Sequence, residues 1–243
     1  MNVVIPMAGD SKIFKDAGFK YSKNFIEINR KPLFQRICES VKRIEAKKFI
    51  FIVSNEDSRK YHIDKSLKLI IPKCKVIVTE KQTAGSACSI LLASEFIDND
   101  DELIISNGDM MLEIELQIAI ENFRKNKWDG GIITFESIHP RWSFVRLDEN
   151  NYVIEAAEKK PISNNATAGF YYYKHGSDFV SSVKSMIRKD ANVNGLYYAC
   201  PAYNEMILKQ KIIGCYKIDS ANYYPLTTPK EILEYEEHLK AMR

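Results

Sequence analysis

Four short apolar runs, each ending in small or polar residues, recur through the first 110 residues of the chain. They lie at residues 2–7, 48–54, 74–80 and 101–109. Runs of this length that are rich in Val and Ile are typical of strands buried on both faces of a sheet. Residues 32–44 and 86–97, which lie between the runs, carry apolar side chains at helical spacing. The alternation predicts an α/β fold with a layered, mostly parallel, Rossmann-like sheet flanked by helices.

The chain changes in character after residue 128. Short β-rich segments separated by turn residues lie at residues 130–137, 143–149, 152–160 and 167–174. A helix, a strand and a last helix are expected at residues 178–189, 212–219 and 228–242. Thr228 and Glu231 form the pattern of a capping box at the start of the last helix. Since no linker or repeat interrupts the sequence, we expect one domain over residues 1–243, with halves at 1–127 and 128–243.

The charge and cysteine content exclude several classes of protein. The 35 basic and 32 acidic residues are scattered and leave a net charge of +3, so we expect no nucleic-acid partner. The five cysteines form no CxxC pair, which favours free thiols in a reducing compartment. No apolar run is long enough to span a bilayer, and the first residues lack the pattern of a signal peptide. We therefore expect a cytoplasmic protein with no membrane partner.

Three polar clusters follow the first, third and fourth apolar runs. They read MAGDSK at 7–12, TEKQTAGS at 79–86 and SNGD at 106–109. Because ligands of open α/β sheets bind beside the carboxyl ends of the strands, these clusters are candidates for one binding site.

Each cluster has two interpretations when it is taken alone. Asp109 could hold Mg²⁺ together with phosphate oxygens, but Asn-Gly-Asp is equally good turn chemistry. The small residues 84–87 could let a ligand approach backbone N–H groups, or they could form an ordinary strand-to-helix turn. The first loop has Gly9 for close approach, and its lysines could bind phosphate or be solvated at the surface. Those lysines are Lys12, Lys15, Lys20 and Lys23.

Taken together and in order, the clusters resemble the motifs of the sugar-nucleotidyltransferase family, which has the GT-A type of fold. The matching segments are VVIPMAGDSKIF…YSKNFIEINRKPLF, QTAGSACSILLA, SNGD, AAEKKPISNNATAGFYYYK and TTPKEIL. The likeness covers nearly the whole chain and is greatest to capsule-cluster nucleotidyltransferases, a branch that includes cytidylyltransferases acting on phosphoglutamine.

The resemblance implies transfer of a nucleoside monophosphate, with CMP from CTP favoured, to a small phosphorylated acceptor. Pyrophosphate is released, Mg²⁺ is the cofactor, and a role in capsule polysaccharide synthesis follows from the branch. Residues 1–127 would bind the nucleotide and residues 128–243 the acceptor. The attacking acceptor phosphate is already anionic, so the reaction needs no general base.

The resemblance also assigns roles to residues that match the motifs. The residues expected to contact the nucleotide are Met7, Ala8, Gly9, Asp10, Ser11, Lys12, Lys23, Gln82, Gly85, Ser86, Ala87, Asn107 and Gly108. Lys23, Asp109 and Lys12 are expected to act in catalysis, and Asp109 and Asp219 are expected to hold Mg²⁺. The residues expected at the acceptor are Glu158, Lys159, Lys160 and Gly169, with Arg141, Trp142 and Tyr203 added by location.

The chain departs from the family motif in its first loop. Ser11 replaces a glycine, Ile13 replaces the arginine that grips the triphosphate, and Ser22 and Asn24 replace two prolines. These departures keep open a nucleotide-binding homologue with weakened catalysis. A sugar-1-phosphate nucleotidyltransferase using another NTP and a GT-A glycosyltransferase are further alternatives, although the latter would be expected to carry a D-x-D motif at the strand end. The sequence leaves the oligomeric state open, including a homo-oligomer.

Overall fold

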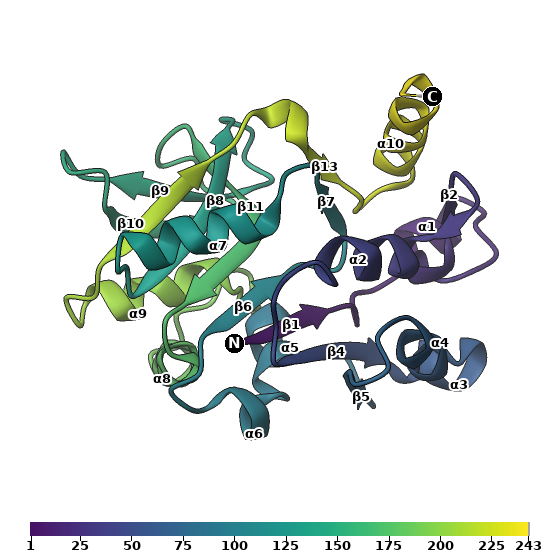
Figure 1. Ribbon diagram of the computed structural model, residues 1–243, viewed down its shortest axis with the longest axis horizontal. Coiled ribbons are helices and arrows are strands. Elements are labelled where there is room, and N and C mark those ends of the chain that lie inside the picture. Colours follow the sequence, from purple (N-terminus) through teal and green to yellow (C-terminus); the bar gives the residue numbers. More distant parts are fainter. Residues whose placement is uncertain (243) are drawn as a thin grey trace.

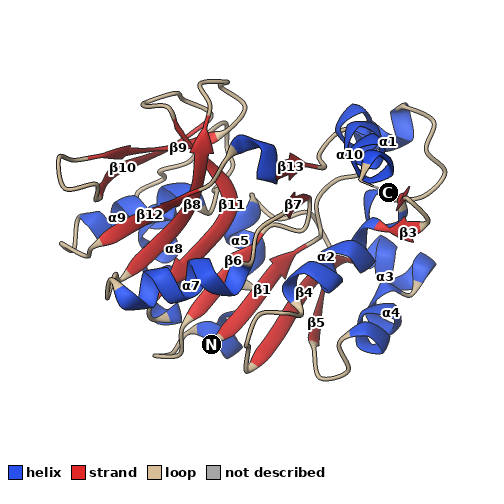
Figure 2. Ribbon diagram, turned by 45° about the horizontal axis from the view of Figure 1, so that its top comes forward, coloured by secondary structure: helices blue, strands red, loops and turns tan. Residues whose placement is uncertain are grey.

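The computed structural model describes residues 1–242 and has a nine-stranded mixed sheet at its centre (Figures 1 and 2). The strands of this sheet are β1 (Asn2–Pro6), β4 (Lys48–Ser54), β5 (Lys75–Thr79), β6 (Leu103–Ser106), β8 (Gly130–Glu136), β9 (Ser143–Leu147), β10 (Val153–Glu158), β11 (Asn165–Tyr173) and β12 (Ile213–Lys217). Two small sheets pair β2 (Glu27–Ile28) with β3 (Lys31–Pro32) and β7 (Met110–Leu112) with β13 (Tyr223–Pro225).

The nine-stranded sheet joins a parallel part to a mixed part. Strands β6, β1, β4 and β5 are neighbours in that order and run parallel. Strand β11 pairs antiparallel with β6, β8 and β9, and β12 returns parallel to β8. The predicted α/β fold with a late β-rich extension is confirmed.

Helices cover both faces of the sheet. The longer ones are α2 (Leu33–Val41), α3 (Asn55–Tyr61), α4 (Ile63–Ile70), α5 (Ser86–Leu91), α7 (Leu116–Lys125), α8 (Gly176–Arg188) and α10 (Pro229–Ala241). The short ones are α1 (Lys12–Asp16), α6 (Ser94–Ile97), α9 (Tyr203–Ile207) and the 3-10 turns η1 (Lys23–Phe25), η2 (Cys200–Ala202) and η3 (Ser220–Asn222). No helix within residues 1–242 is long and apolar enough to cross a membrane.

The alternation of side chains along β1 divides the core between the two faces. Val3 and Ile5 belong to a core cluster with residues of α2 and α7, while Val4 belongs to a second cluster with residues of α5, α8 and α9. Figure 1 shows where these helices lie around the sheet. All three side chains are fully buried, as expected for a central parallel strand.

Several expected elements differ in extent. The helix expected at 86–97 is two helices, α5 and α6, because the N–H groups of Leu92 and Ala93 bond the carbonyls three residues back, which makes a turn between them. The strand expected at 101–109 ends at Ser106, and the following residues turn toward β7. Helices α3, α4 and α7 lie in segments for which no element was predicted.

The C-terminal part of the chain folds back beside the end of β6. Strand β13 pairs with β7, and the Leu226 N–H donates a 2.8 Å hydrogen bond to the backbone carbonyl of Asp109. Thr228 and Glu231 form the predicted capping box of α10, and the Asn29 N–H donates to the Glu236 carboxylate on this helix. The last helix therefore packs beside the turn between β2 and β3.

Candidate active site

The first loop, residues 7–24, is held against the end of β1. The Asn24 side-chain amide donates to the Met7 carbonyl at 2.9 Å and to Asp57 at 2.7 Å, and both asparagine and aspartate are buried. The Ser11 hydroxyl accepts from the Lys23 N–H at 3.0 Å. These bonds bring η1 beside Gly9, so that an ideal Cβ at Gly9 would lie 3.5 Å from the Lys23 ammonium.

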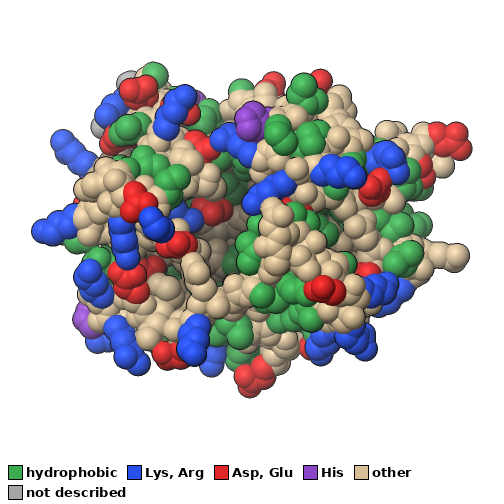
Figure 3. Space-filling model, turned by 180° about the vertical axis from the view of Figure 1, so that it is seen from behind, with side chains coloured by type: hydrophobic (Ala, Val, Ile, Leu, Met, Phe, Trp, Pro, Cys, Tyr) green, Lys and Arg blue, Asp and Glu red, His purple; other side chains and the backbone are tan. Residues whose placement is uncertain are grey.

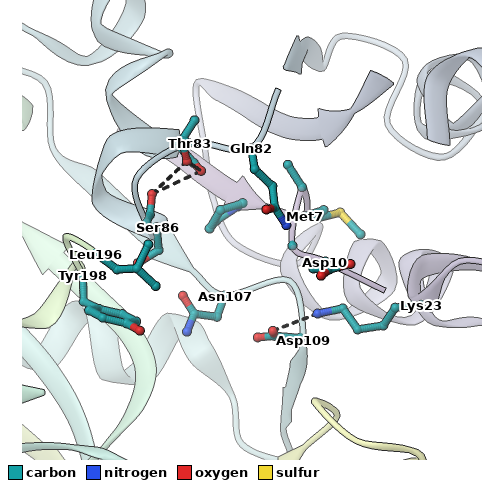
Figure 4. A pocket seen from close by; sticks show the side chains of 15 residues that line it. Met7, Asp10, Lys23, Gln82, Thr83, Ser86, Asn107, Asp109, Leu196 and Tyr198 are labelled. Atoms are coloured by element: carbon teal, nitrogen blue, oxygen red, sulfur yellow. Dashed lines mark hydrogen bonds and ion pairs between the residues drawn. The ribbon is translucent and has the colours of Figure 1, made fainter. Parts of the chain in front are cut away.

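An ion pair between Lys23 and Asp109 lies at the centre of the site (Figure 4). The Lys23 Nζ is 3.0 Å from the Asp109 Oδ2. The lysine side chain is only 8% exposed, whereas the aspartate side chain is 32% exposed. A buried ammonium is therefore neutralised by a carboxylate that solvent or a ligand can still reach.

A cavity of about 320 Å³ adjoins this ion pair. Its lining includes ten of the residues predicted to be functional, namely Met7, Ala8, Gly9, Asp10, Lys23, Gln82, Gly85, Ser86, Asn107 and Asp109. Pro6, Thr83, Ser89, Leu196 and Tyr198 complete it. Figure 4 shows the side chains of Gln82, Ser86, Tyr198 and Lys23 arranged around the same space. We refer to it as the first cavity.

The loop before α5 takes its shape from contact with residues 196–198. Gly85 has φ +108°, and a Cβ there would lie 2.3 Å from the Tyr197 carbonyl oxygen. The Ala87 N–H donates to that carbonyl, and the Tyr197 N–H donates to the Ala84 carbonyl. Only glycine fits such a close approach, and the contact places Leu196 and Tyr198 in the cavity wall.

A second cavity, of about 270 Å³, adjoins the first. The two share the lining residues Ser86, Asn107, Asp109 and Tyr198. The other residues of the second cavity are Arg141, Trp142, Ser143, Glu158, Thr167, Gly169, Tyr171, Ala199, Cys200, Tyr223 and Thr227. One face of the molecule is hollowed near its centre, with acidic side chains inside the hollow and lysine and arginine around it (Figure 3).

Gly169 fixes the backbone between the two cavities. Its φ is +72°, its carbonyl accepts from the Asn107 N–H at 2.9 Å, and a Cβ would lie 2.7 Å from the Asn107 side-chain nitrogen. A side chain at this position would displace Asn107, which lines both cavities.

The second cavity contains a carboxylate and a guanidinium. Glu158 is half-buried and accepts a hydrogen bond from the Ser143 hydroxyl, and burial raises the pKa of its carboxyl. Arg141 lies 3.9 Å above the Trp142 ring and pairs with Glu231 at 2.5 Å. The cavity thus contains a carboxyl group that can bind a cationic group of a ligand and a guanidinium that can donate hydrogen bonds to an anionic group.

Other residues predicted for the site line neither cavity. They are Ser11, Lys12, Ala87, Gly108, Lys159, Lys160, Tyr203 and Asp219. Two of them hydrogen-bond the backbone of another segment: Ser11 bonds Lys23, and Ala87 bonds Tyr197. Gly108 packs so closely that there is no room for a side chain, and all three thus hold the loops in place. Lys159 lies at the rim, where its ammonium donates to the Tyr198 hydroxyl at 3.0 Å, and this hydrogen bond raises its pKa.

Four of these residues point to other partners or to solvent. Lys12 is 73% exposed and pairs with Asp16, and Lys160 is exposed. Tyr203 is fully buried in the core, where its hydroxyl donates to the carbonyls of Gly131 and Tyr172, so its placement at the acceptor was wrong. The Asp219 carboxylate accepts from the Ala221 N–H and caps η3.

The lining residues that sequence reasoning missed fall into three groups. Pro6, Thr83, Ser89 and Ser143 lie within two residues of a predicted site residue. Tyr171 and Thr167 lie two residues either side of Gly169 on β11, so strand periodicity could have found them. Residues 196–200 and 223–227 reach the cavities through contacts far apart in sequence, and no local pattern marks them.

Asp109 is the residue of this site that could hold Mg²⁺. The Asp109 carboxylate is accessible and adjoins both cavities, but within residues 1–242 no three Asp, Glu, His or Cys side chains gather as a metal site. Mg²⁺ is often held by one or two carboxylates together with substrate phosphates. Asp109 fits that arrangement as a single protein ligand, whereas Asp219 lines neither cavity.

The fold is that of an α/β protein. Its two adjoining cavities lie at the carboxyl ends of β1 and β6 and have room for two ligands in contact. Residues 7–206 match the model of the nucleotidyl transferase family. The chain therefore belongs to that family.

Relatives in sequence are distant. The bifunctional protein GlmU of Thermotoga petrophila is 23% identical over 245 residues, covering 99% of this chain and 52% of that protein. GlmU of Pseudothermotoga lettingae is 24% identical over 152 residues, covering 61% of this chain and 32% of that protein. The chain spans about half the length of these relatives or less.

Solved structures share the fold at low identity. A nucleoside-diphosphate-sugar pyrophosphorylase from Vibrio cholerae RC9 has a TM-score of 0.84 at 23% identity, with 97% of this chain and 99% of that chain covered. A UDP-glucose pyrophosphorylase complexed with UDP-glucose has a TM-score of 0.80 at 18% identity, covering 100% and 99%. The inositol-1-phosphate CTP transferase from T. maritima has a TM-score of 0.76 at 14% identity, covering 98% and 96%.

Proposed function

We propose that the protein transfers a nucleoside monophosphate from an NTP to a small phosphorylated acceptor and releases pyrophosphate. The observation that carries this proposal is the shared wall of the two cavities, which contains Asp109, the ion-pair partner of Lys23. A nucleotide in the first cavity and an acceptor in the second would meet at that wall. Membership of the nucleotidyl transferase family supports the same reaction.

The reaction asks the protein for alignment and charge neutralisation. An oxygen of the acceptor phosphate attacks the α-phosphorus, a new P–O bond forms, and the bond to the bridging oxygen breaks as pyrophosphate leaves. Lys23, which lines the first cavity beside Asp109, would neutralise charge at the α-phosphate. Mg²⁺, held by Asp109 with phosphate oxygens, would supply further positive charge.

The finer assignment is CTP as donor, a phosphoglutamine-like acceptor, and a role in capsule or surface-polysaccharide modification in the cytoplasm. It is supported by the motif resemblance and by the CTP transferase among the structural neighbours. The second cavity adds support, because Arg141 and Glu158 could pair with the carboxylate and ammonium of a phosphorylated amino acid.

Two alternatives have their own support. A sugar-1-phosphate nucleotidyltransferase that uses another NTP is favoured by the two pyrophosphorylases of sugar nucleotides among the neighbours. A catalytically weakened homologue is favoured by Ile13, which is 49% exposed where the family motif has an arginine. Family membership favours either of these over a glycosyltransferase.

The test measures pyrophosphate release with each of the four NTPs, Mg²⁺ and a panel of phosphorylated acceptors that includes phosphoglutamine and sugar 1-phosphates. We expect release with CTP and an amino-acid phosphate, and its loss in Asp109→Asn. Release only with a sugar 1-phosphate would replace the finer assignment. No release from any pair, with CTP still bound in calorimetry, would leave the weakened homologue.

A further inference from the structure

The segment from Tyr223 to Glu231, which we call the C-terminal strap, forms part of the second cavity. Its β13 pairs with β7, and its Leu226 N–H bonds the carbonyl of Asp109. Tyr223 and Thr227 of the strap line the cavity. The strap lies outside the residues matched by the family model, which end at 206.

Glu231 joins the strap to the opposite wall of the cavity. The side chain is buried, with 6% exposed. Its Oε2 accepts from the Thr227 N–H at 2.9 Å, the Thr227 hydroxyl at 2.8 Å and the Thr228 N–H at 2.9 Å. Its Oε1 accepts from Arg141 at 2.5 Å. A buried carboxylate is stable only when its oxygens are bonded in this way, so the geometry around Glu231 is closely fixed.

Arg141 is oriented by two contacts. Its guanidinium lies 3.9 Å above the Trp142 ring, and that ring packs edge-on against Phe135 and Tyr223 with centroids 5.6 and 5.4 Å away. Within residues 1–242, the guanidinium makes one side-chain hydrogen bond, from Nη1 to Glu231. The donors on Nε and Nη2 are left to bind a ligand.

Arg141 is also the source of positive charge in the lining of the second cavity. Among its lining residues, all within the described part of the chain, Arg141 is the one lysine or arginine. A phosphorylated acceptor is anionic, so this guanidinium is its natural partner in the cavity.

We propose that Glu231 is a positioning residue for the acceptor: it fixes Arg141 on Trp142 so that the guanidinium faces an anionic group of the bound acceptor. The inference rests on the proposed function for the identity of the ligand as an acceptor. The contacts themselves do not depend on the reaction. An arginine side chain without Glu231 would be free to move over several rotamers, and orientation would be lost.

The first experiment reads the position of Arg141 without turnover. Trp142 is one of two tryptophans, so Trp128→Phe makes its fluorescence the sole signal. In this background we expect Glu231→Gln to raise the acrylamide quenching constant of Trp142, because the guanidinium no longer covers the ring. Glutamine keeps the size of the side chain and an oxygen for the strap N–H groups. The matched control is Thr228→Ala, which removes the cap of α10 but no contact to Arg141.

The second experiment titrates inorganic phosphate at constant ionic strength and follows the same fluorescence. We expect phosphate to bind about tenfold more weakly to Glu231→Gln and to Arg141→Lys than to the parent, and equally to Thr228→Ala. Arg141→Lys, an exposed position, keeps the test usable if Glu231→Gln fails to fold. Equal quenching and equal phosphate affinity in the parent and either variant would overturn the proposal.

Kinetics with a working NTP and acceptor provide the readout specific to positioning. Glu231→Gln and Arg141→Lys should each raise the KM of the acceptor about tenfold or more and leave the KM of the NTP nearly unchanged. The double variant should be no worse than Arg141→Lys alone. Additive effects, or an equal rise in both KM values, would overturn the inference. If no pair releases pyrophosphate, the proposed function fails, while the fluorescence experiments still decide the role of Glu231.

Discussion

At the scale of single residues, the pair of Lys23 and Asp109 has two different exposures. The lysine is a buried residue of the first loop, and the aspartate reaches both cavities. A charge held in this way is already oriented before a ligand arrives, which is how electrostatic stabilisation of a transition state is most effective.

Replacement of Lys23 tests this arrangement. We expect Lys23→Ala to lower pyrophosphate release by about 10²- to 10³-fold, as is usual when one oriented donor to a developing charge is removed. Lys12→Ala should lower it less, because Lys12 is exposed and paired with Asp16. A loss of equal size in both variants would show that the first loop grips the triphosphate with Lys12 as well.

Glu158 gives a prediction on pH. Burial raises the pKa of its carboxyl in the folded state above the usual 4.5, so its ionisation favours the unfolded state. The contribution of Glu158 to the free energy of unfolding is therefore fully present below the pKa that the carboxyl has in the unfolded chain. It is lost as the pH rises through the higher pKa that the carboxyl has in the folded protein. We therefore expect Glu158→Gln to raise the melting temperature near neutral pH and to have a smaller effect in mild acid. Thermal unfolding of the parent and of Glu158→Gln near neutral pH and in mild acid would test this prediction. An equal shift in melting temperature under the two conditions would contradict it.

At the scale of elements, the backbone of the loop before α5 is fitted to residues 196–198. Gly85 has a positive φ, and a Cβ added at this position would lie 2.3 Å from the carbonyl oxygen of Tyr197. Gly195 has a positive φ of +76° but open space around it. The two glycines separate the cost of backbone strain from the cost of a clash.

We expect Gly85→Ala to be clearly more destabilising than Gly195→Ala. Strain alone costs about 1–3 kcal/mol, and at Gly85 the loop must also move away from Tyr197. Urea unfolding would measure the stability, and calorimetry with CTP would show whether binding is lost only in Gly85→Ala. Similar losses in both variants would mean that the contact with Tyr197 is not important.

The same elements show what the sequence can predict. Strands such as β1 and β4 were recognised because a continuous apolar run is a local property. The runs that became β5 and β6 then located Gly85 and Asp109, which follow them and lie where parallel strands place ligands. Tyr198, Tyr223 and Thr227 could not be found in this way, because they reach the cavities only through tertiary contacts. The single helix expected at 86–97 is longer than either of the two observed helices, because apolar spacing does not reveal a break between short helices.

At the scale of the whole molecule, the two cavities draw on both halves of the chain. Residues 6–10, 82–89 and 107–109 meet residues 196–200 in the walls of the first cavity or the second. A ligand that fills this space therefore binds the folded protein and not the unfolded chain, so its binding stabilises the fold.

A nucleotide should thus raise the melting temperature. At about 100 times its dissociation constant, a ligand adds about 2.7 kcal/mol, which is roughly 5–10 °C for a domain of this size. We expect CTP with Mg²⁺ to give the largest shift among the four NTPs, and Asp109→Asn to lose the part that depends on Mg²⁺. A thermal-shift assay with each NTP, with and without Mg²⁺, provides the measurement. A larger shift with another NTP would contradict the preference for CTP.

The hydrogen bond from Leu226 to Asp109 has a consequence for how the protein matures. During synthesis, the first loop, β1 and β6 leave the ribosome long before the strap does. The segment around Asp109 gains its last backbone partner only when Leu226 has been made and β13 has paired with β7. A nascent chain can thus build most of its sheet while its candidate active site is still incomplete. Completion of that site waits for the pairing of β13 with β7.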